Sequence, residues 1–169
     1  MGDVVSEFYC GQTPYRHNDS YWQGSVNWLA SGDLNRGLVT KTEERITELG
    51  RKSTGLRLVP RGTVIVATMG QEAPGTRGNC GILGIESTIN QACMALFVDE
   101  AVIDNAFLFQ WYKAVGNAYG LKYTQGTKQQ NYNADTLGSL NIGVPSITEQ
   151  HRIGSLFSSL DNLITLHQR

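Results

Sequence analysis

The clearest hydrophobic pattern of this chain lies at its C-terminal end. Ser146 and Glu149 stand there at the spacing of a capping box, directly after Pro145. Apolar residues then recur at steps of three and four positions, which is the spacing of one helical face: Ile153, Leu156, Phe157, Leu160, Leu163 and Ile164. The pattern predicts a helix of roughly 22 residues, about 33 Å long, with one continuous apolar stripe.

Three other segments are predicted to be helical. Residues 104–119 combine helical spacing with a broad apolar surface, and residues 135–140 fit a short helix. Residues 40–50 have the end signals of a helix. They offer threonines to cap its start, acidic residues for its first turn and a glycine for its end: Thr40 or Thr42, Glu43, Glu44 and Gly50.

Short apolar runs bounded by turn residues predict strands. The clearest is the β-branched run at residues 64–68, which follows Gly62. Four more are expected at residues 26–30, 81–89, 92–98 and 140–145. We therefore expect an α/β chain of the mixed α+β kind. A β-rich domain with flanking helices would occupy residues 1–145, and a long coiled-coil-type helix residues 146–169.

Composition and length limit the classes of protein. The chain has 169 residues, which suits one domain with a helical appendage. Hydrophobic residues make up 40% and charged residues 17%, so the chain is not disordered. No apolar run approaches the ~20 residues that span a bilayer. The N-terminus lacks the basic start and apolar stretch of a signal peptide. We expect a soluble, cytoplasmic protein.

The overall charge gives no support for nucleic-acid binding, because the formal net charge is −1. Any DNA binding must therefore rest on a local patch. Residues 36–61 supply one, because they contain three acidic residues, Glu43, Glu44 and Glu48, and seven basic ones, which leaves a local net charge of +4. The basic residues are Arg36, Lys41, Arg45, Arg51, Lys52, Arg57 and Arg61. The alternative is a solvated helix and turn with surface ion pairs.

Signatures of catalysis are missing from the sequence. There is no GxxxxGK[ST] loop for ATP, no Asn/Asp-Pro-Pro-Tyr/Phe element, no glycine-rich turn for a methyl donor and no GxSxG elbow. Asp99, Glu100 and Asp104 are too few and too scattered for a nuclease site. Cys10, Cys80 and Cys93 are far apart, which favours reduced thiols over a metal site. We expect a binding protein rather than an enzyme.

Three segments resemble the specificity subunits of type I restriction-modification systems. Residues 140–153, Leu-Asn-Ile-Gly-Val-Pro-Ser-Ile-Thr-Glu-Gln-His-Arg-Ile, are similar to the family's junction of strand, proline, Glu-Gln and spacer helix, and residues 160–168 continue the match. Residues 126–131 look like its Gly-Thr-x-Gln-x-Asn loop. Residues 11–28, from Gly11-Gln-Thr-Pro through Tyr21-Trp22 to Trp28, are similar to the opening of such domains.

The resemblance implies a recognition domain on a spacer helix that reads one half of a split double-stranded DNA target. It also implies a methyltransferase (modification) subunit that uses S-adenosylmethionine, and a restriction or motor subunit that uses ATP and magnesium. The chain itself would need no cofactor and no membrane. A full specificity subunit has two recognition domains and two spacers, whereas this chain has one of each. The second half either comes from another copy or is missing. The first alternative predicts a homodimer, or a dimer completed within the methyltransferase complex.

DNA recognition needs cations for phosphates and flat polar side chains for base edges. The candidates are Arg16, Asn18, Arg36, Lys41, Arg77, Thr127, Lys128, Gln129 and Asn131. For residues 126–131 the alternative is a polar turn that caps nearby backbone groups. The apolar stripe of the last helix is expected to contact another helix rather than its own domain.

Two other classes of function stay open. One is a stand-alone ligand-binding module that uses Tyr21, Trp22 and Trp28 as a sugar platform, although core or rim packing suits these aromatic residues better. The other is an assembly protein that uses its terminal helix alone.

Overall fold

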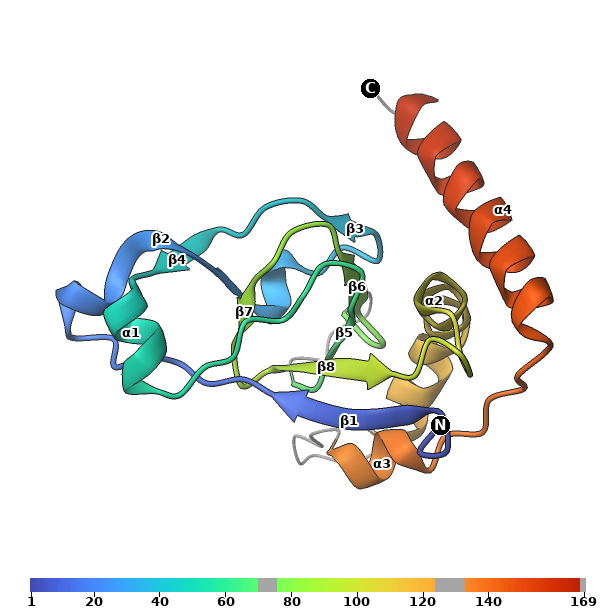
Figure 1. Cartoon of the computed structure of the whole chain (residues 1–169), viewed down its shortest axis with the longest axis horizontal. Helices are drawn as coiled ribbons and strands as arrows, with labels where there is room; N and C mark the ends of the chain where they lie inside the picture. The colour runs from blue at the N-terminus through green and yellow to red at the C-terminus, as the bar shows by residue number, and fades with distance from the viewer. Residues whose placement is uncertain (70–75, 124–132, 168–169) are drawn as a thin grey trace.

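The chain folds into two β-sheets, a helical layer and one protruding helix (Figure 1). The structure is a computed structural model and describes residues 1–69, 76–123 and 133–167. The larger sheet has five strands in the order β1-β8-β5-β6-β3. Their bounds are Val5–Cys10 for β1, Cys93–Val98 for β8, Val64–Ala67 for β5, Cys80–Leu83 for β6 and Leu38–Val39 for β3. Neighbours are antiparallel except β3 and β6, which are parallel.

The smaller sheet has three strands in the order β4-β2-β7. They are Glu44–Ile46 (β4), Trp22–Leu29 (β2) and Thr88–Ile89 (β7). β2 is antiparallel to β4 and parallel to β7. Short 3-10 turns at Asp19–Tyr21 and Ser31–Asp33 lead into and out of β2.

The core lies on both faces of β5, which is buried along its whole length. Val64 and Val66 face one hydrophobic cluster together with Leu108 and Tyr112 of helix α2 (Asn105–Tyr123). Ile65 and Ala67 face a second cluster beneath the smaller sheet. A strand covered on both faces has no polar side to present. This explains why residues 64–67 are a continuous apolar run rather than an alternating one.

Three more helices complete the fold. α1 (Glu48–Ser53) packs against β2 and β4, and α3 (Ala134–Gly138) lies near the N-terminus. α4 (Ile147–His167) packs on α2 and extends past the body of the domain (Figure 1). The capping box at its start is confirmed, since the Ser146 N–H donates to the Glu149 carboxylate at 3.1 Å and the Glu149 N–H donates to the Ser146 hydroxyl at 3.4 Å. The hydrogen bond from the Ser146 hydroxyl to this carboxylate, together with that from the N–H, lowers the pKa of Glu149.

The predicted helix at residues 40–50 is wrong. Residues 44–46 form β4 and pair with residues 26–28 of β2, and the helix begins only at Glu48. Thr47 caps it by accepting a hydrogen bond from the Gly50 backbone at 3.1 Å. Gly50, expected as the end of a helix, lies inside α1. A glycine fits there because an added Cβ would be only 2.5 Å from the Tyr21 carbonyl oxygen. Strand pairing over long range overrides the local end signals.

The other expectations differ in outcome. The strands at residues 64–68 and 92–98 and the helices at 104–119 and 135–140 are confirmed within a few residues. The single strand expected at 81–89 is two strands, β6 and β7. The strand expected at 140–145 is absent from the described structure. Leu140 and Ile142 do pack on the core, but the chain there connects α3 to α4 without a partner strand.

Candidate nucleic-acid interface

Ion pairs neutralise part of the basic segment at residues 36–61. The Arg57 guanidinium pairs with both carboxylate oxygens of Glu7, from β1. This hydrogen bonding lowers the pKa of Glu7. Arg51 pairs with Glu48 at 3.0 Å within α1. Both arginines are therefore engaged inside the domain, so the excess of positive charge that the sequence predicts is only partly available to a partner.

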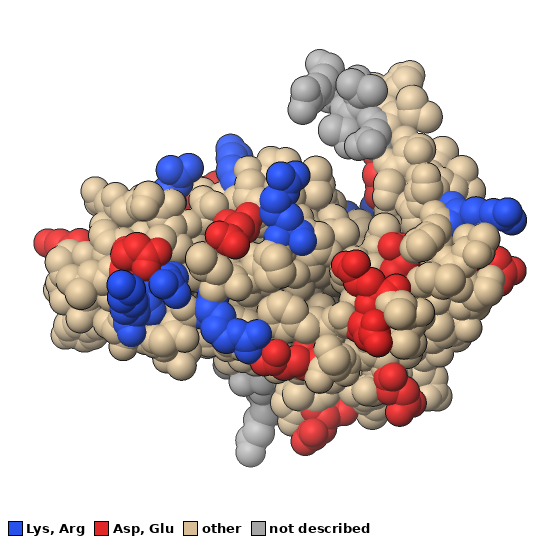
Figure 2. Space-filling model, in the orientation of Figure 1, with Lys and Arg blue, Asp and Glu red and all other residues tan. Residues whose placement is uncertain are grey.

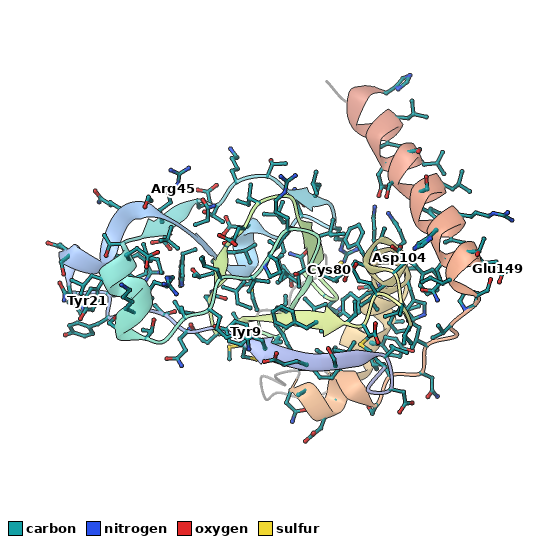
Figure 3. The ribbon with its side chains drawn as sticks, viewed as in Figure 1. Tyr9, Tyr21, Arg45, Cys80, Asp104 and Glu149 are labelled. Atoms are coloured by element: carbon teal, nitrogen blue, oxygen red, sulfur yellow. The ribbon has the colours of Figure 1, made fainter. Side chains whose placement is uncertain are left out.

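Four cations of this segment remain exposed and make no ion pair with any residue that the structure describes: Lys41, Arg45, Lys52 and Arg61. Lys41 lies three residues before β4, and Arg45 lies within it. We call these two residues the basic edge. Figure 3 places Arg45 on the outer side of the smaller sheet, on the same side of the molecule toward which α4 extends. Figure 2 shows basic side chains along this edge, whereas acidic ones gather near the start of α4.

A surface hollow of about 600 Å³ lies beside Arg45. Trp22, Gln23 and Gly24 of β2 line one side, and Glu43 and Arg45 line another. Arg45 stands opposite Asn27 in the β2–β4 pairing, and the Asn27 amide donates to the Glu86 carbonyl at 2.8 Å. Arg45 thus belongs to β4, which is paired with β2, and β2 is itself held by the hydrogen bond of Asn27.

Arg16 and Asn18 are held by contacts within the domain. The Arg16 guanidinium lies 4.0 Å from the ring centre of Trp22 and pairs with both carboxylate oxygens of Glu44. The hydrogen bonds to Glu44 raise the pKa of Arg16. The Asn18 side chain accepts from the Ser20 backbone at 3.2 Å and caps the 3-10 turn.

Arg36 and Arg77 come together although they are far apart in the sequence. The Arg36 guanidinium donates to the Arg77 carbonyl oxygen, and both residues are half-buried. The backbone of Arg36 has a φ of 58°, a left-handed conformation. Its N–H donates to the Cys80 carbonyl at 2.8 Å, which fixes this conformation next to β6. The remaining candidates, Thr127, Lys128, Gln129 and Asn131, lie outside the described residues.

The aromatic residues near β2 do not form a sugar platform. Trp28 is 1% exposed, and Trp22 stacks edge-on against it with ring centres 5.2 Å apart. Arg16 covers Trp22, and the indole N–H groups donate to the carbonyls of Tyr15 and Gln12. These tryptophans pack the domain, so the ligand-binding alternative loses its proposed surface.

Gln150 fastens α4 to the domain at its first turn. Its side chain, 1% exposed, donates to the carbonyls of Val102 and Pro145 at 3.1 and 2.9 Å. Gly154 then allows close approach to α2, because an added Cβ would lie 3.0 Å from the Asp104 carboxylate. Figure 3 shows Asp104 beside the start of α4.

A second attachment lies further along α4. Lys113 of α2 donates to the carboxylate of Asp161 at 2.8 Å, and Gln110 donates to it at 3.0 Å. Burial raises the pKa of Asp161, but these hydrogen bonds outweigh it, so the pKa is lowered overall.

The predicted apolar stripe lies mostly on the free side of α4. Ile153 is half-buried against the core. The other five side chains are 43% to 59% exposed: Leu156, Phe157, Leu160, Leu163 and Ile164. Phe157 lines a hollow with Trp111 of α2, but the described part of the domain leaves all five side chains largely exposed. A stripe of this size on a helix surface is typical of a helix–helix contact.

The cysteines of the core are buried thiols. Cys80 and Cys93 are buried, and burial raises the pKa of Cys80 to about 12 and also raises that of Cys93. Both are therefore protonated core thiols near neutral pH.

The described residues include no cluster of three or more metal-binding side chains. In the same part of the chain, no helix has the length and apolar character to cross a membrane.

These features define a mixed α/β binding domain that carries a protruding helix. The chain belongs to the type I restriction modification DNA specificity domain family, whose sequence pattern matches residues 1–169. It is 26% identical over 163 residues to the type I restriction enzyme MjaIX specificity subunit of Methanocaldococcus jannaschii. It is 24% identical over 162 residues to the EcoR124I/EcoR124II specificity subunit of Escherichia coli. These matches cover 95% and 94% of the chain but only 37% and 39% of the relatives.

Solved structures show the same fold. The HsdS subunit from Thermoanaerobacter tengcongensis is similar over 99% of this chain and 37% of its own, with a TM-score of 0.63 and 15% identity. The specificity subunit from M. genitalium is similar over 95% of this chain and 37% of its own, with a TM-score of 0.66 and 18% identity. This chain therefore spans less than two fifths of the proteins that it resembles.

Two residues that line the surface hollow, Arg45 and Gln23, were not singled out by sequence reasoning. Arg45 was one of seven basic residues, and only the pairing of β4 places it on an exposed edge. Gln23 carried no signal at all, because its left-handed φ of 59° is a property of the folded strand.

Proposed function

We propose that this chain is a sequence-specific DNA-recognition subunit, or half-subunit, that reads one half of a bipartite double-stranded target. Residues 1–145 would form the recognition domain and residues 146–169 the spacer and dimerisation helix. Membership of the specificity family supports this proposal. The single observation that carries it is the basic edge, because Lys41 and Arg45 are exposed and make no ion pair with a described residue.

The basic edge suits phosphate contacts. Phosphate binding needs cations that are not already neutralised, held on a surface that a duplex can reach. Lys41 and Arg45 meet both conditions, whereas the charges of Arg51 and Arg57 are engaged. Arg36, Arg77 and the loop at residues 126–131 remain proposed contacts. Arg16 and Asn18 act through the shape of the domain, since both are held by neighbours.

Catalysis belongs to other subunits in this proposal. A methyltransferase subunit would supply S-adenosylmethionine chemistry, and a restriction or motor subunit would use ATP and magnesium. The relatives are specificity subunits of restriction enzymes by name, which supports this division of roles.

The exposed stripe of α4 supports a second element of the function, which is self-association. Two copies related by a two-fold axis would set their α4 helices antiparallel and supply two recognition domains. The target would then consist of two inverted half-sites at a spacing fixed by the helices.

Selection of bound sequences from a random duplex DNA pool tests the proposal. The full chain is used alone and together with the modification subunit of its system. We expect a split motif with inverted halves. Binding without any sequence preference in both arrangements contradicts specific recognition. A motif with a single half-site contradicts the two-fold model but not DNA recognition.

A further inference from the structure

The backbone of Gln23 has a left-handed conformation that glutamine seldom adopts. Its φ of 59° lies in the left-handed region, which glycine and asparagine adopt more readily than glutamine. Such residues persist where the surrounding structure holds them, and they gather at functional sites. The side chain is exposed and makes no hydrogen bond with any residue that the structure describes. No described residue of the domain therefore uses the amide.

The bulge that carries Gln23 is firmly fixed. The β2–β4 register shifts between Trp22 and Val26, so the intervening residues bulge out of the sheet. The Thr47 N–H donates to the Tyr21 carbonyl at 2.9 Å. Gly24 lies so close to β4 that an added Cβ would be 2.5 Å from the Ile46 carbonyl oxygen. A side chain that projects from this bulge has a fixed origin, which base recognition requires.

The surroundings of Gln23 suit a base edge better than a phosphate. Gln23 lines the hollow of about 600 Å³ together with Arg45, Asp19 and Glu43. The rim therefore carries one exposed cation, Arg45, which can reach a single phosphate, beside two exposed carboxylates and the ion pair of Arg16 with Glu44, so the hollow as a whole is not a phosphate pocket.

We propose that Gln23 is a specificity-determining residue that recognises one adenine of the DNA half-site in the major groove. The side-chain amide offers one donor and one acceptor side by side, which matches the N7 acceptor and N6 donor of adenine. Arg45, on the rim of the same hollow, contacts the neighbouring phosphate. This inference rests on the proposed function and names a residue of its DNA-contacting surface.

The test compares Gln23→Gly and Gln23→Ala with the wild-type chain in selections from a random duplex pool, followed by titration of the selected duplex and its single-base variants. Both variants lack the amide, but only glycine relieves the left-handed strain. We expect both to lose preference for adenine at one position, by roughly five- to a hundredfold, with the rest of the motif unchanged. The control Asn141→Ala removes an exposed amide at the far end of the domain and should leave the motif unchanged.

Stability separates recognition from a structural role. We expect Gln23→Gly to melt within about 3 °C of the wild type or above it, since the relief of strain offsets the added freedom of the unfolded chain. A large fall in melting temperature for both variants would assign Gln23 to structure and overturn the inference. An unchanged motif in both variants, or a wild-type motif with another base at the affected position, also overturns it while the proposed function stands. A wild-type chain that selects no motif removes the proposed function and this inference with it.

Discussion

The Gln150 side chain accepts a hydrogen bond from the backbone N–H of Asp104 at 2.8 Å and so joins the first turn of α4 to the start of α2. The same amide donates to the carbonyls of Val102 and Pro145. One buried side chain thus satisfies three backbone groups from two segments. The direction in which α4 leaves the domain depends on these bonds.

Gln150→Ala should destabilise the chain by about 2–3 kcal/mol, because it removes three hydrogen bonds and leaves buried backbone groups without partners. Urea unfolding measures the change in the free energy of unfolding. Thr148→Ala, at an exposed position of the same helical turn, is the control and should change it by less than about 0.5 kcal/mol. Equal stabilities of the two variants would contradict the role that we give to Gln150.

Asp161→Asn should lower stability by about 0.5–1 kcal/mol near neutral pH, a small value because the carboxylate is partly exposed. The folded-state pKa of Asp161 lies below its ordinary value. Its contribution is therefore present above the unfolded-state pKa and is lost as the pH falls through the folded-state pKa. Wild type and variant should converge once the pH lies well below the folded-state pKa. A difference that persists unchanged there would mean that the ion pair with Lys113 is not its source.

Leu156→Glu combined with Leu160→Glu should give a folded monomer. Burial of each leucine in a helix pair is worth about 1.5–3 kcal/mol, so two charged replacements abolish association. Sedimentation at matched concentrations measures the state, and circular dichroism checks folding. Ser155→Glu adds a charge away from the stripe and should leave the dimer intact. A wild-type chain that stays monomeric at high concentration, and with its modification subunit bound, would falsify the symmetric arrangement.

Lys41→Ala and Arg45→Ala should each weaken DNA binding and lower the salt slope of the binding constant by about one unit, as expected for the loss of one phosphate contact. Lys52→Ala removes an equally exposed cation on α1 and should leave the slope nearly unchanged. Fluorescence titration at several salt concentrations measures all three. If all three variants have the wild-type slope, the phosphate contacts lie elsewhere, with Arg77 and Lys128 as the next candidates.

Arg16→Ala should act on stability rather than on the salt slope. The guanidinium lies over Trp22 and pairs with Glu44, so its loss should cost about 1–2 kcal/mol. Arg16→Lys should recover only part of this, because an ammonium cannot form the two-pronged pair. Thermal unfolding and DNA titration of both variants check the two effects separately. A salt slope that falls by one unit would return Arg16 to the DNA-contacting set.

The sequence by itself determined the elements whose signals are local. The α4 helix was predicted from the Ser146–Glu149 capping box and from apolar steps of three and four residues, both of which depend only on neighbours along the helix. The β5 strand was predicted from an unbroken β-branched run, and α2 from its helical spacing. Family membership also came from short motifs, since their order along the chain survives without knowledge of the fold.

Only the tertiary structure decided what depends on residues far apart. Residues 44–46 became a strand because β2 pairs with them, whereas residues 140–145 pair with no strand in the described part of the chain. The charge of Arg57 is engaged by Glu7, fifty positions away in the sequence, whereas Arg45 stays exposed. Local sequence patterns record the spacing of apolar and polar groups, but not which distant backbone or carboxylate will meet them. These long-range contacts decide which cations stay exposed, and they leave the side chain of Gln23 available to a partner.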